Sequence, residues 1–174
     1  EEHVSRAPKQ PFFCYVSYTA PHVPLQADRK QAGKNRERYQ LGWDVIRQQR
    51  FDKLSQSSGQ RGLSQLPPRP KDIPAWSSLA TEQQQDLADR MAMYATQVER
   101  LDHGVGTILK TPETSKHLNN TLIIFLSDNG ANPIGGVPGT TDLPGQVLGE
   151  PGSKASYGKG WAHVSNTPFN GYKG

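Results

Sequence analysis

The stretch Thr121-Leu-Ile-Ile-Phe-Leu-Ser127 is apolar at every position between its two hydroxyl-bearing ends. A strand with one face in water alternates apolar and polar residues, so an unbroken apolar run is typical of a strand that is covered on both faces. Strands of this kind occur in parallel sheets that lie between layers of helices. Residues Thr121–Ser127 therefore predict an α/β fold.

A second apolar and aromatic stretch, Pro11-Phe-Phe-Cys-Tyr-Val-Ser-Tyr18, also predicts a buried strand. Between the two stretches, residues 81–109 carry apolar side chains spaced alternately three and four residues apart, which predicts one long α-helix. Thr81 and Gln84 are predicted to form a capping box at its start. These apolar positions are Leu87, Met91, Tyr94, Val98, Leu101, Val105 and Ile108. A shorter helix is predicted over Trp43–Leu54.

The order strand, helix, strand predicts parallel strands that are joined by right-handed crossovers. Two strands do not make a stable open sheet, so we expect the remaining strands to come from sequence outside this chain. Proline and glycine predict loops elsewhere. Thr19–Leu25 holds two prolines that forbid a helix, Ser55–Pro74 holds four, and Gly130–Gly160 is rich in both residues.

Charge and cysteine content narrow the function classes. The chain has 174 residues and a net charge of +4, which only mildly favours anionic partners. Its most basic stretch, Arg29–Lys53, is interleaved with acids and predicts a solvated face, so we expect no nucleic-acid partner. Cys14 is the only cysteine, which excludes an internal disulfide. No apolar run approaches the roughly 18 residues of a membrane span.

Polar side chains follow both predicted strands. His22 comes four residues after Tyr18, and Asp128-Asn129-Gly130 directly follows Ser127. Open α/β sheets bind ligands beyond the carboxyl ends of their strands, so parallel strands would bring both groups to one edge of the sheet. The two groups are therefore candidates for one functional site.

Each candidate side chain has a chemical and a structural interpretation. Asp128 and Asn129 offer hard oxygen ligands for Ca²⁺ or Mg²⁺, but the same residues with Gly130 also form ordinary turns. His22 suits an anionic substrate or proton transfer, or else a structural hydrogen bond in its loop. Lys173 could meet an anion as a point charge or could remain solvated.

Five stretches, in order along nearly the whole chain, resemble segments of the type I sulfatases, the arylsulfatases. They are Pro11–Leu25, Tyr39–Arg50, Met93–Asp102, Thr121–Gly130 and Gly160–Lys173. The resemblance implies the alkaline-phosphatase-like sandwich, an α/β fold with a mainly parallel central sheet flanked by helices. We expect that fold to be incomplete in this chain.

The resemblance also implies an activity and a set of site residues. Type I sulfatases hydrolyse a sulfate ester to an alcohol and inorganic sulfate. Asp128 and Asn129 match two ligands of the family's divalent cation, usually Ca²⁺ with Mg²⁺ as the alternative, and His22 and Lys173 match residues that contact the sulfate. A cation and fixed donors around the sulfate oxygens would stabilise the charge that develops during S–O cleavage.

One part of the family pattern is missing from the sequence. The family's nucleophile is a formylglycine made from Cys or Ser in a Cys-x-Pro-Ser-Arg type motif, whereas Cys14 is followed by Tyr15-Val16-Ser17. We expect Cys14 to be a buried strand residue instead. We therefore expect residues 1–174 to be part of a sulfatase catalytic domain, without its N-terminal nucleophile segment and its C-terminal part, and inactive alone.

Other functions remain open at this stage. The protein could be a related phosphatase or phosphonate hydrolase, or a catalytically inactive relative that binds sulfated glycans. The expected substrate is a small-molecule or glycan sulfate ester. Members of the family are often periplasmic, secreted or lysosomal, but the sequence itself does not indicate a compartment. Asn119-Asn120-Thr121 fits an N-glycosylation acceptor. The sequence does not indicate an oligomeric state.

Overall fold

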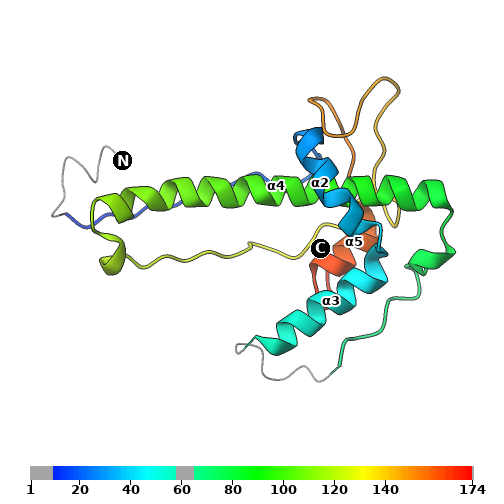
Figure 1. Cartoon of the computed structure of the whole chain (residues 1–174), viewed down its shortest axis with the longest axis horizontal. Coiled ribbons are helices and arrows are strands. Elements are labelled where there is room, and N and C mark those ends of the chain that lie inside the picture. The colour runs from blue at the N-terminus through cyan, green and yellow to red at the C-terminus, as the bar shows by residue number, and fades with distance from the viewer. Residues whose placement is uncertain (1–9, 58–64, 174) are drawn as a thin grey trace.

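The computed structural model of the chain describes residues 10–57 and 65–173, in which helices are the regular elements (Figure 1). The helices are α2 (Arg29–Tyr39), α3 (Gly42–Gln56), α4 (Thr81–Thr114) and α5 (Gly158–Ser165), with short 3₁₀ turns η1 (Trp76–Ser78) and η2 (Leu118–Asn120). Helix α4 runs the length of the molecule, α2 packs across it, and α3 packs against α5 (Figure 1). Within the described ranges, no helix combines the length and the apolar character that crossing a lipid bilayer demands.

The long predicted helix is confirmed as α4, with two differences at its ends. Ala80, not Thr81, is the N-cap, and its N–H donates to the Gln83 side chain at 3.2 Å, so the predicted capping box was wrong by one residue. The side-chain NH₂ of Gln84 instead donates to the Trp76 carbonyl at 3.0 Å. At the other end α4 continues to Thr114, because helical glycines cost only about 1 kcal/mol each.

The prediction of a helix over Trp43–Leu54 is confirmed by α3, but α2 and α5 were not predicted. Helix α2 is strongly polar and buries only Ala32 and Tyr39, so it has almost no apolar periodicity. Its start is marked by Asp28, whose carboxylate accepts from the Lys30 N–H at 2.8 Å. Helix α5 is short and begins inside the region Gly130–Gly160, which was predicted to be a loop because it is rich in glycine and proline.

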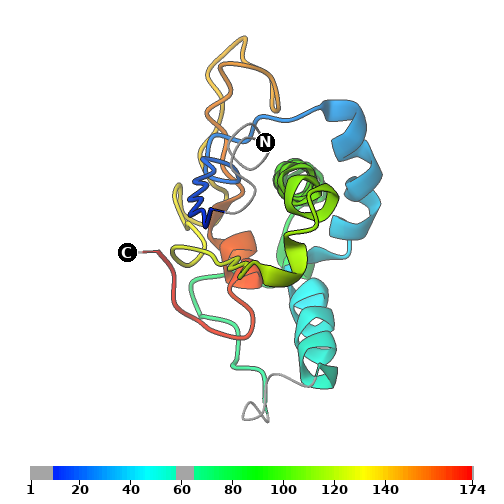
Figure 2. The same cartoon turned by 90° about the vertical axis from the view of Figure 1, so that its left-hand side faces the viewer.

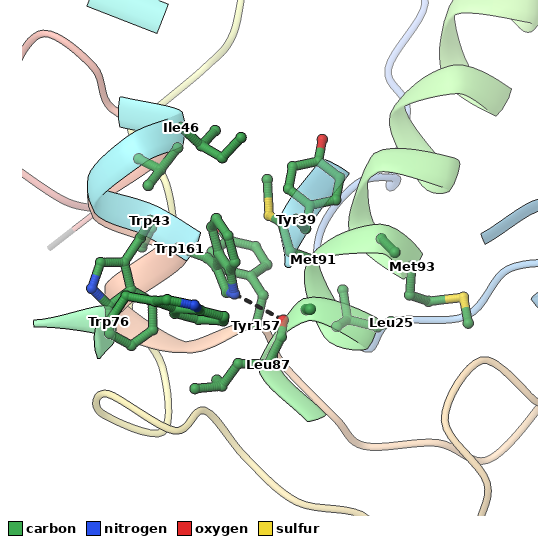
Figure 3. Packing of buried hydrophobic residues seen from close by; sticks show 14 of the residues in the cluster. Leu25, Tyr39, Trp43, Ile46, Trp76, Leu87, Met91, Met93, Tyr157 and Trp161 are labelled. Atoms are coloured by element: carbon green, nitrogen blue, oxygen red, sulfur yellow. Dashed lines mark hydrogen bonds between the residues drawn. The ribbon is translucent and has the colours of Figure 1, made fainter. Parts of the chain in front are cut away.

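The core is centred on three tryptophans from three different segments (Figure 3). The ring of Trp43 packs edge-on against Trp76 at 4.8 Å and against Trp161 at 5.9 Å between ring centroids. The indole N–H of Trp161 donates to the Leu87 carbonyl at 2.8 Å, shown as the dashed line in Figure 3. Aromatic pairs and this bond therefore fix α3, η1 and α5 against α4.

The two predicted strands are extended segments without ladder partners, so the predicted sheet is not formed within the described residues. Those residues contain one isolated parallel bridge, between Gln26 and Gly149. Phe13 is 91% exposed and Leu122 is 86% exposed, and Cys14 is exposed, not buried as predicted. The reason is that a strand is buried only by neighbouring strands and covering layers, which the described residues do not supply.

The two extended segments nevertheless have a defined arrangement. Both 11–18 and 121–127 run in the same direction in Figure 1, from the C-terminal end of α4 toward its middle. Figure 2, which looks along α4, shows them as separate traces on the same side of the helix. The candidate site groups, residues 22 and 128–129, follow these two segments in the chain.

Candidate functional site

The loop that carries His22 is held to the rest of the molecule on both of its sides. The Gln97 side chain of α4 donates to the Pro24 carbonyl at 3.2 Å. The Leu25 N–H donates to the Ala155 carbonyl at 3.0 Å, and the Leu25 side chain is fully buried. These contacts fix the backbone that follows His22, while the imidazole itself is exposed.

Lys173 reaches this histidine from the far end of the chain. Its side-chain nitrogen Nζ lies 3.5 Å from Nε2 of His22. The other ring nitrogen, Nδ1, lies 2.8 Å from the carbonyl oxygen of Val23. A carbonyl only accepts, so Nδ1 carries the hydrogen, and in the neutral ring Nε2 is the acceptor that faces the lysine.

The backbone of Lys173 is tied to the chain that follows the Asp128–Asn129 pair. The Lys173 N–H donates to the Ala131 carbonyl at 3.0 Å, and the Ala131 N–H donates to Oδ1 of Asn166 at 2.8 Å. Gly130 allows this approach, because a Cβ there would lie 3.2 Å from Oδ1 of Asn166 and 3.5 Å from the Lys173 nitrogen. The turn after the second extended segment therefore packs directly on the segment that carries Lys173.

Asp128 and Asn129 are both exposed in this turn. The Ser127 hydroxyl donates to the Asn129 carbonyl at 2.8 Å, and the Asn129 side-chain NH₂ donates to the Gly130 carbonyl at 2.9 Å. These local bonds use the amide nitrogen of Asn129 but not its side-chain oxygen. This oxygen and the Asp128 carboxylate are oxygen ligands of the type that Ca²⁺ prefers.

A complete cation site needs more ligands than this pair. Ca²⁺ takes about six to eight oxygen ligands. The part of the chain that the structure describes holds no group of three or more His, Cys, Asp or Glu side chains suited to a metal ion. The pair Asp128 and Asn129 thus fits a divalent cation in ligand chemistry, but two residues are too few to complete its coordination.

The predicted site residues are brought together to different degrees. The side chains of His22 and Lys173 face each other, and the Lys173 backbone contacts Ala131, three residues after Asp128. Among residues 10–57 and 65–173, no side-chain hydrogen bond or ion pair joins Asp128 or Asn129 to His22 or Lys173. The catalytic and ligand roles of these four residues stay predictions.

Sequence analysis missed a buried cation that is hydrogen-bonded to residues 167–170, just before Lys173. Arg47 of α3 is only 4% exposed, although it lies in the stretch that was predicted to be a solvated face. Burial lowers the pKa of its guanidinium below the usual value. A signal was present, because Arg47 follows Trp43 by four residues and Ile46 by one, which places it beside the buried stripe of the helix.

Comparison with known proteins agrees with the resemblance in the motifs. Residues 2–173 match the family model described as Sulfatase. The chain is 34% identical over 178 residues to an arylsulfatase of Klebsiella aerogenes and 34% identical over 187 residues to an uncharacterised sulfatase of Schizosaccharomyces pombe, which covers 97% and 98% of this chain. It is 30% identical over 166 residues to the N-sulphoglucosamine sulphohydrolase of Homo sapiens, which covers 90% of this chain.

The matched region is only part of each relative. The chain spans 38%, 33% and 28% of the length of these three proteins, or about a third. The family model, in contrast, matches the chain almost from end to end. Together with these relatives, the match over residues 2–173 shows that the chain belongs to the sulfatase family.

Proposed function

We propose that the protein containing this chain is a metal-dependent sulfatase that hydrolyses a sulfate monoester to an alcohol and inorganic sulfate. The observation that carries the proposal is the 3.5 Å approach of Lys173 Nζ to His22 Nε2. Both residues match sulfate-contacting positions of the family, and they come from opposite ends of the chain. An ammonium and an imidazole that face each other at an exposed position form a suitable site for an anionic group.

The two side chains have different proposed roles. The Lys173 ammonium donates hydrogen bonds to the non-bridging oxygens of the sulfate, which carry its negative charge. Cleavage of the S–O bond moves an electron pair onto the bridging oxygen of the leaving alcohol. We propose that His22, when its Nε2 also carries a proton, delivers that proton to the bridging oxygen, so the alcohol leaves neutral. Water then supplies the fourth oxygen of the sulfate and returns a proton to the ring.

Asp128 and Asn129 are the proposed ligands of a divalent cation, Ca²⁺ with Mg²⁺ as the alternative. When bound, the ion supplies fixed positive charge beside the sulfate oxygens. The remaining ligands and the nucleophile, a formylglycine in the family, are proposed to lie outside residues 1–174. Cys14 does not match the formylglycine motif, so residues 1–174 alone are expected to be inactive.

The extended segments 11–18 and 121–127 are proposed to be strands of the mainly parallel central sheet of an alkaline-phosphatase-like sandwich. Their common direction and their exposed apolar side chains support this proposal (Figure 1). Neighbouring strands from outside the described residues would cover Phe13 and Leu122 and would complete the backbone hydrogen bonds.

The proposal is tested by assaying the full-length protein with p-nitrophenyl sulfate, p-nitrophenyl phosphate and a phosphonate monoester. We expect hydrolysis of the sulfate ester, its loss after chelation with EDTA, and recovery with added Ca²⁺. Faster turnover of the phosphate or phosphonate would favour the related hydrolases. Binding of a sulfated glycan without turnover of any ester would favour an inactive relative. Clear metal-dependent turnover by residues 1–174 alone would contradict the proposed division of the site.

A further inference from the structure

Arg47 makes an unusual set of contacts for a buried charge. Its guanidinium donates to the His163 carbonyl at 2.6 Å, which is in the last turn of α5. All its other acceptors lie in the segment between α5 and Lys173. They are Oγ1 of Thr167 at 3.3 Å, the carbonyls of Pro168 at 3.2 Å and Phe169 at 3.3 Å, and Oδ1 of Asn170 at 2.9 Å.

No carboxylate among the described residues pairs with this guanidinium. A buried charge is costly unless hydrogen bonds replace its hydration. Here the His163 carbonyl and oxygens of residues 167–170 accept from Nη1 and Nη2, whereas Nε has no partner among the described residues. The planar fork of arginine can bind several such acceptors at once, which a lysine or an apolar residue cannot do. The contacts thus hold residues 167–170 against α3.

The same segment leads directly to Lys173. Beyond Asn170, the Gly171 carbonyl accepts from Asn166 Nδ2 at 2.6 Å, and the Lys173 N–H donates to the Ala131 carbonyl at 3.0 Å. These residues have no helix or strand to fix their path. Arg47 therefore links helices α3 and α5 to residues 167–170, the first part of the segment that leads to Lys173.

We propose that Arg47 is a positioning residue that holds segment 167–170 in place and so sets the position of Lys173 next to His22. The inference rests on the proposed function, because it gives Lys173 a task at the sulfate. Arg47 does not itself touch the substrate. A displacement of about 1 Å at a catalytic group costs up to about 100-fold in rate, so the loss of this anchor has a measurable effect.

A double-mutant cycle between the two residues tests the inference in the full-length protein. Arg47→Met, Lys173→Met and the double variant are compared by kcat/KM on p-nitrophenyl sulfate, well below the melting temperature of each protein. We expect Arg47→Met to lower kcat/KM by about 10- to 100-fold alone, but by less than about threefold when Lys173 is already Met. A purely structural role would lower activity by the same factor in both backgrounds.

Arg50 provides the matched control, since it lies on the same helix and donates to the Val164 carbonyl at 3.3 Å but makes no hydrogen bond to the described residues 167–170. Arg50→Met is expected to leave kcat/KM within about twofold in both backgrounds. Arg47→Lys keeps the buried charge but loses the planar guanidinium that binds several acceptors at once. Its kcat/KM is expected to lie between those of the wild type and Arg47→Met. If Arg47→Met does not fold, the cycle is run with Arg47→Lys.

The outcomes separate the two proposals. An active wild type with equal Arg47 effects in both backgrounds, or with no Arg47 effect at all, overturns the positioning role alone. A wild type that hydrolyses no sulfate ester overturns the proposed function and this inference with it. Non-additivity confined to the Arg47–Lys173 pair supports both.

Discussion

The Nζ atom of Lys173 lies 3.5 Å from Nε2 of His22, although the two residues are separated by 151 positions in the sequence. Each side chain is presented by a loop whose backbone is fixed by hydrogen bonds, to α4 in one case and to Ala131 in the other. Two cation-forming groups are thus held together, and no carboxylate of the described residues forms an ion pair with either of them. Such an arrangement is favourable when an anion occupies the space beside them.

Replacing Lys173 by methionine tests its proposed task at the sulfate. The change keeps most of the side-chain volume and removes the donor, and we expect kcat on p-nitrophenyl sulfate to fall by about 10²- to 10³-fold in the full-length protein. The matched control is Lys34→Met, on the exposed side of α2, which is expected to leave kcat unchanged. Equal rates for wild type and Lys173→Met would contradict the assignment.

Replacing Asp128 by alanine tests the cation ligand. The change removes the only carboxylate of the Asp128–Asn129 pair, so we expect the apparent affinity for Ca²⁺ to fall by at least about 10-fold, with loss of activity at limiting Ca²⁺. Isothermal titration calorimetry and a Ca²⁺ titration of the rate measure the two effects. Asp102→Ala, at an exposed position of α4, is the control and is expected to change neither. Unchanged Ca²⁺ affinity in Asp128→Ala would remove the pair from the proposed site.

His163 is expected to make the protein sensitive to acid. Its side chain is 1% exposed, and neither ring nitrogen finds a hydrogen-bond partner within the described residues. Burial, together with the charge of Arg47, lowers the pKa of His163 from 6.5 to about 4. As the pH falls below 6.5, the unfolded chain binds a proton that the folded protein does not, so the contribution of His163 to stability is lost between pH 6.5 and about 4.

His163→Phe keeps the ring volume and removes the titration. We expect the unfolding free energy, and with it the melting temperature, of the variant to fall less than that of the wild type between pH 6.5 and 4.5. The slopes of unfolding free energy against pH are expected to differ by up to about 1.4 kcal/mol per pH unit. Differential scanning calorimetry across this range measures it. His103→Gln, at an exposed position of α4, is the control and should keep the wild-type slope. Parallel curves for wild type and His163→Phe would refute the account.

Gly160→Ala tests the tryptophan cluster. A Cβ at this position would lie 2.6 Å from ring atoms of Trp43, so the two helices must move apart, and we expect a loss of about 1–3 kcal/mol in unfolding free energy. The control is Gly33→Ala in α2, where a Cβ meets nothing within 4 Å, and which should gain roughly 0.5–1 kcal/mol. The chain has only three tryptophans, all in this cluster, so their fluorescence reports its loss. Equal unfolding free energies for Gly160→Ala and Gly33→Ala would contradict close packing between Gly160 and Trp43.

The fold could be predicted from the sequence where the pattern of apolar residues within one segment is enough to determine its structure. The alternating three and four spacing in α4 is local, and it was read correctly apart from the cap at Ala80. The apolar segments 11–18 and 121–127 carry an equally clear signal, but a strand also needs a neighbour. Within the described residues that neighbour is absent, and Phe125 remains 73% exposed. Their membership of a sheet is still a prediction.

The candidate site, too, depends on contacts between residues far apart in the sequence, which local patterns do not predict. The family resemblance pointed to His22 and Lys173, and the structure places their side chains in contact, a relationship over 151 positions that no local pattern encodes. Arg47 was assigned to a solvated face because charge patterning describes composition and not burial. The two buried neighbours in the same helical stripe, Trp43 and Ile46, carried the information that could have corrected it.

The central claim is that Lys173, His22 and the Asp128–Asn129 pair surround one sulfate group. A crystal structure of the full-length protein with bound Ca²⁺ and sulfate tests it most directly. The account predicts side-chain oxygens of Asp128 and Asn129 about 2.3–2.6 Å from the ion. It also predicts Lys173 Nζ and His22 Nε2 within about 3.2 Å of oxygens of a single sulfate. A cation bound elsewhere, or a sulfate that touches neither Lys173 nor His22, would contradict the account.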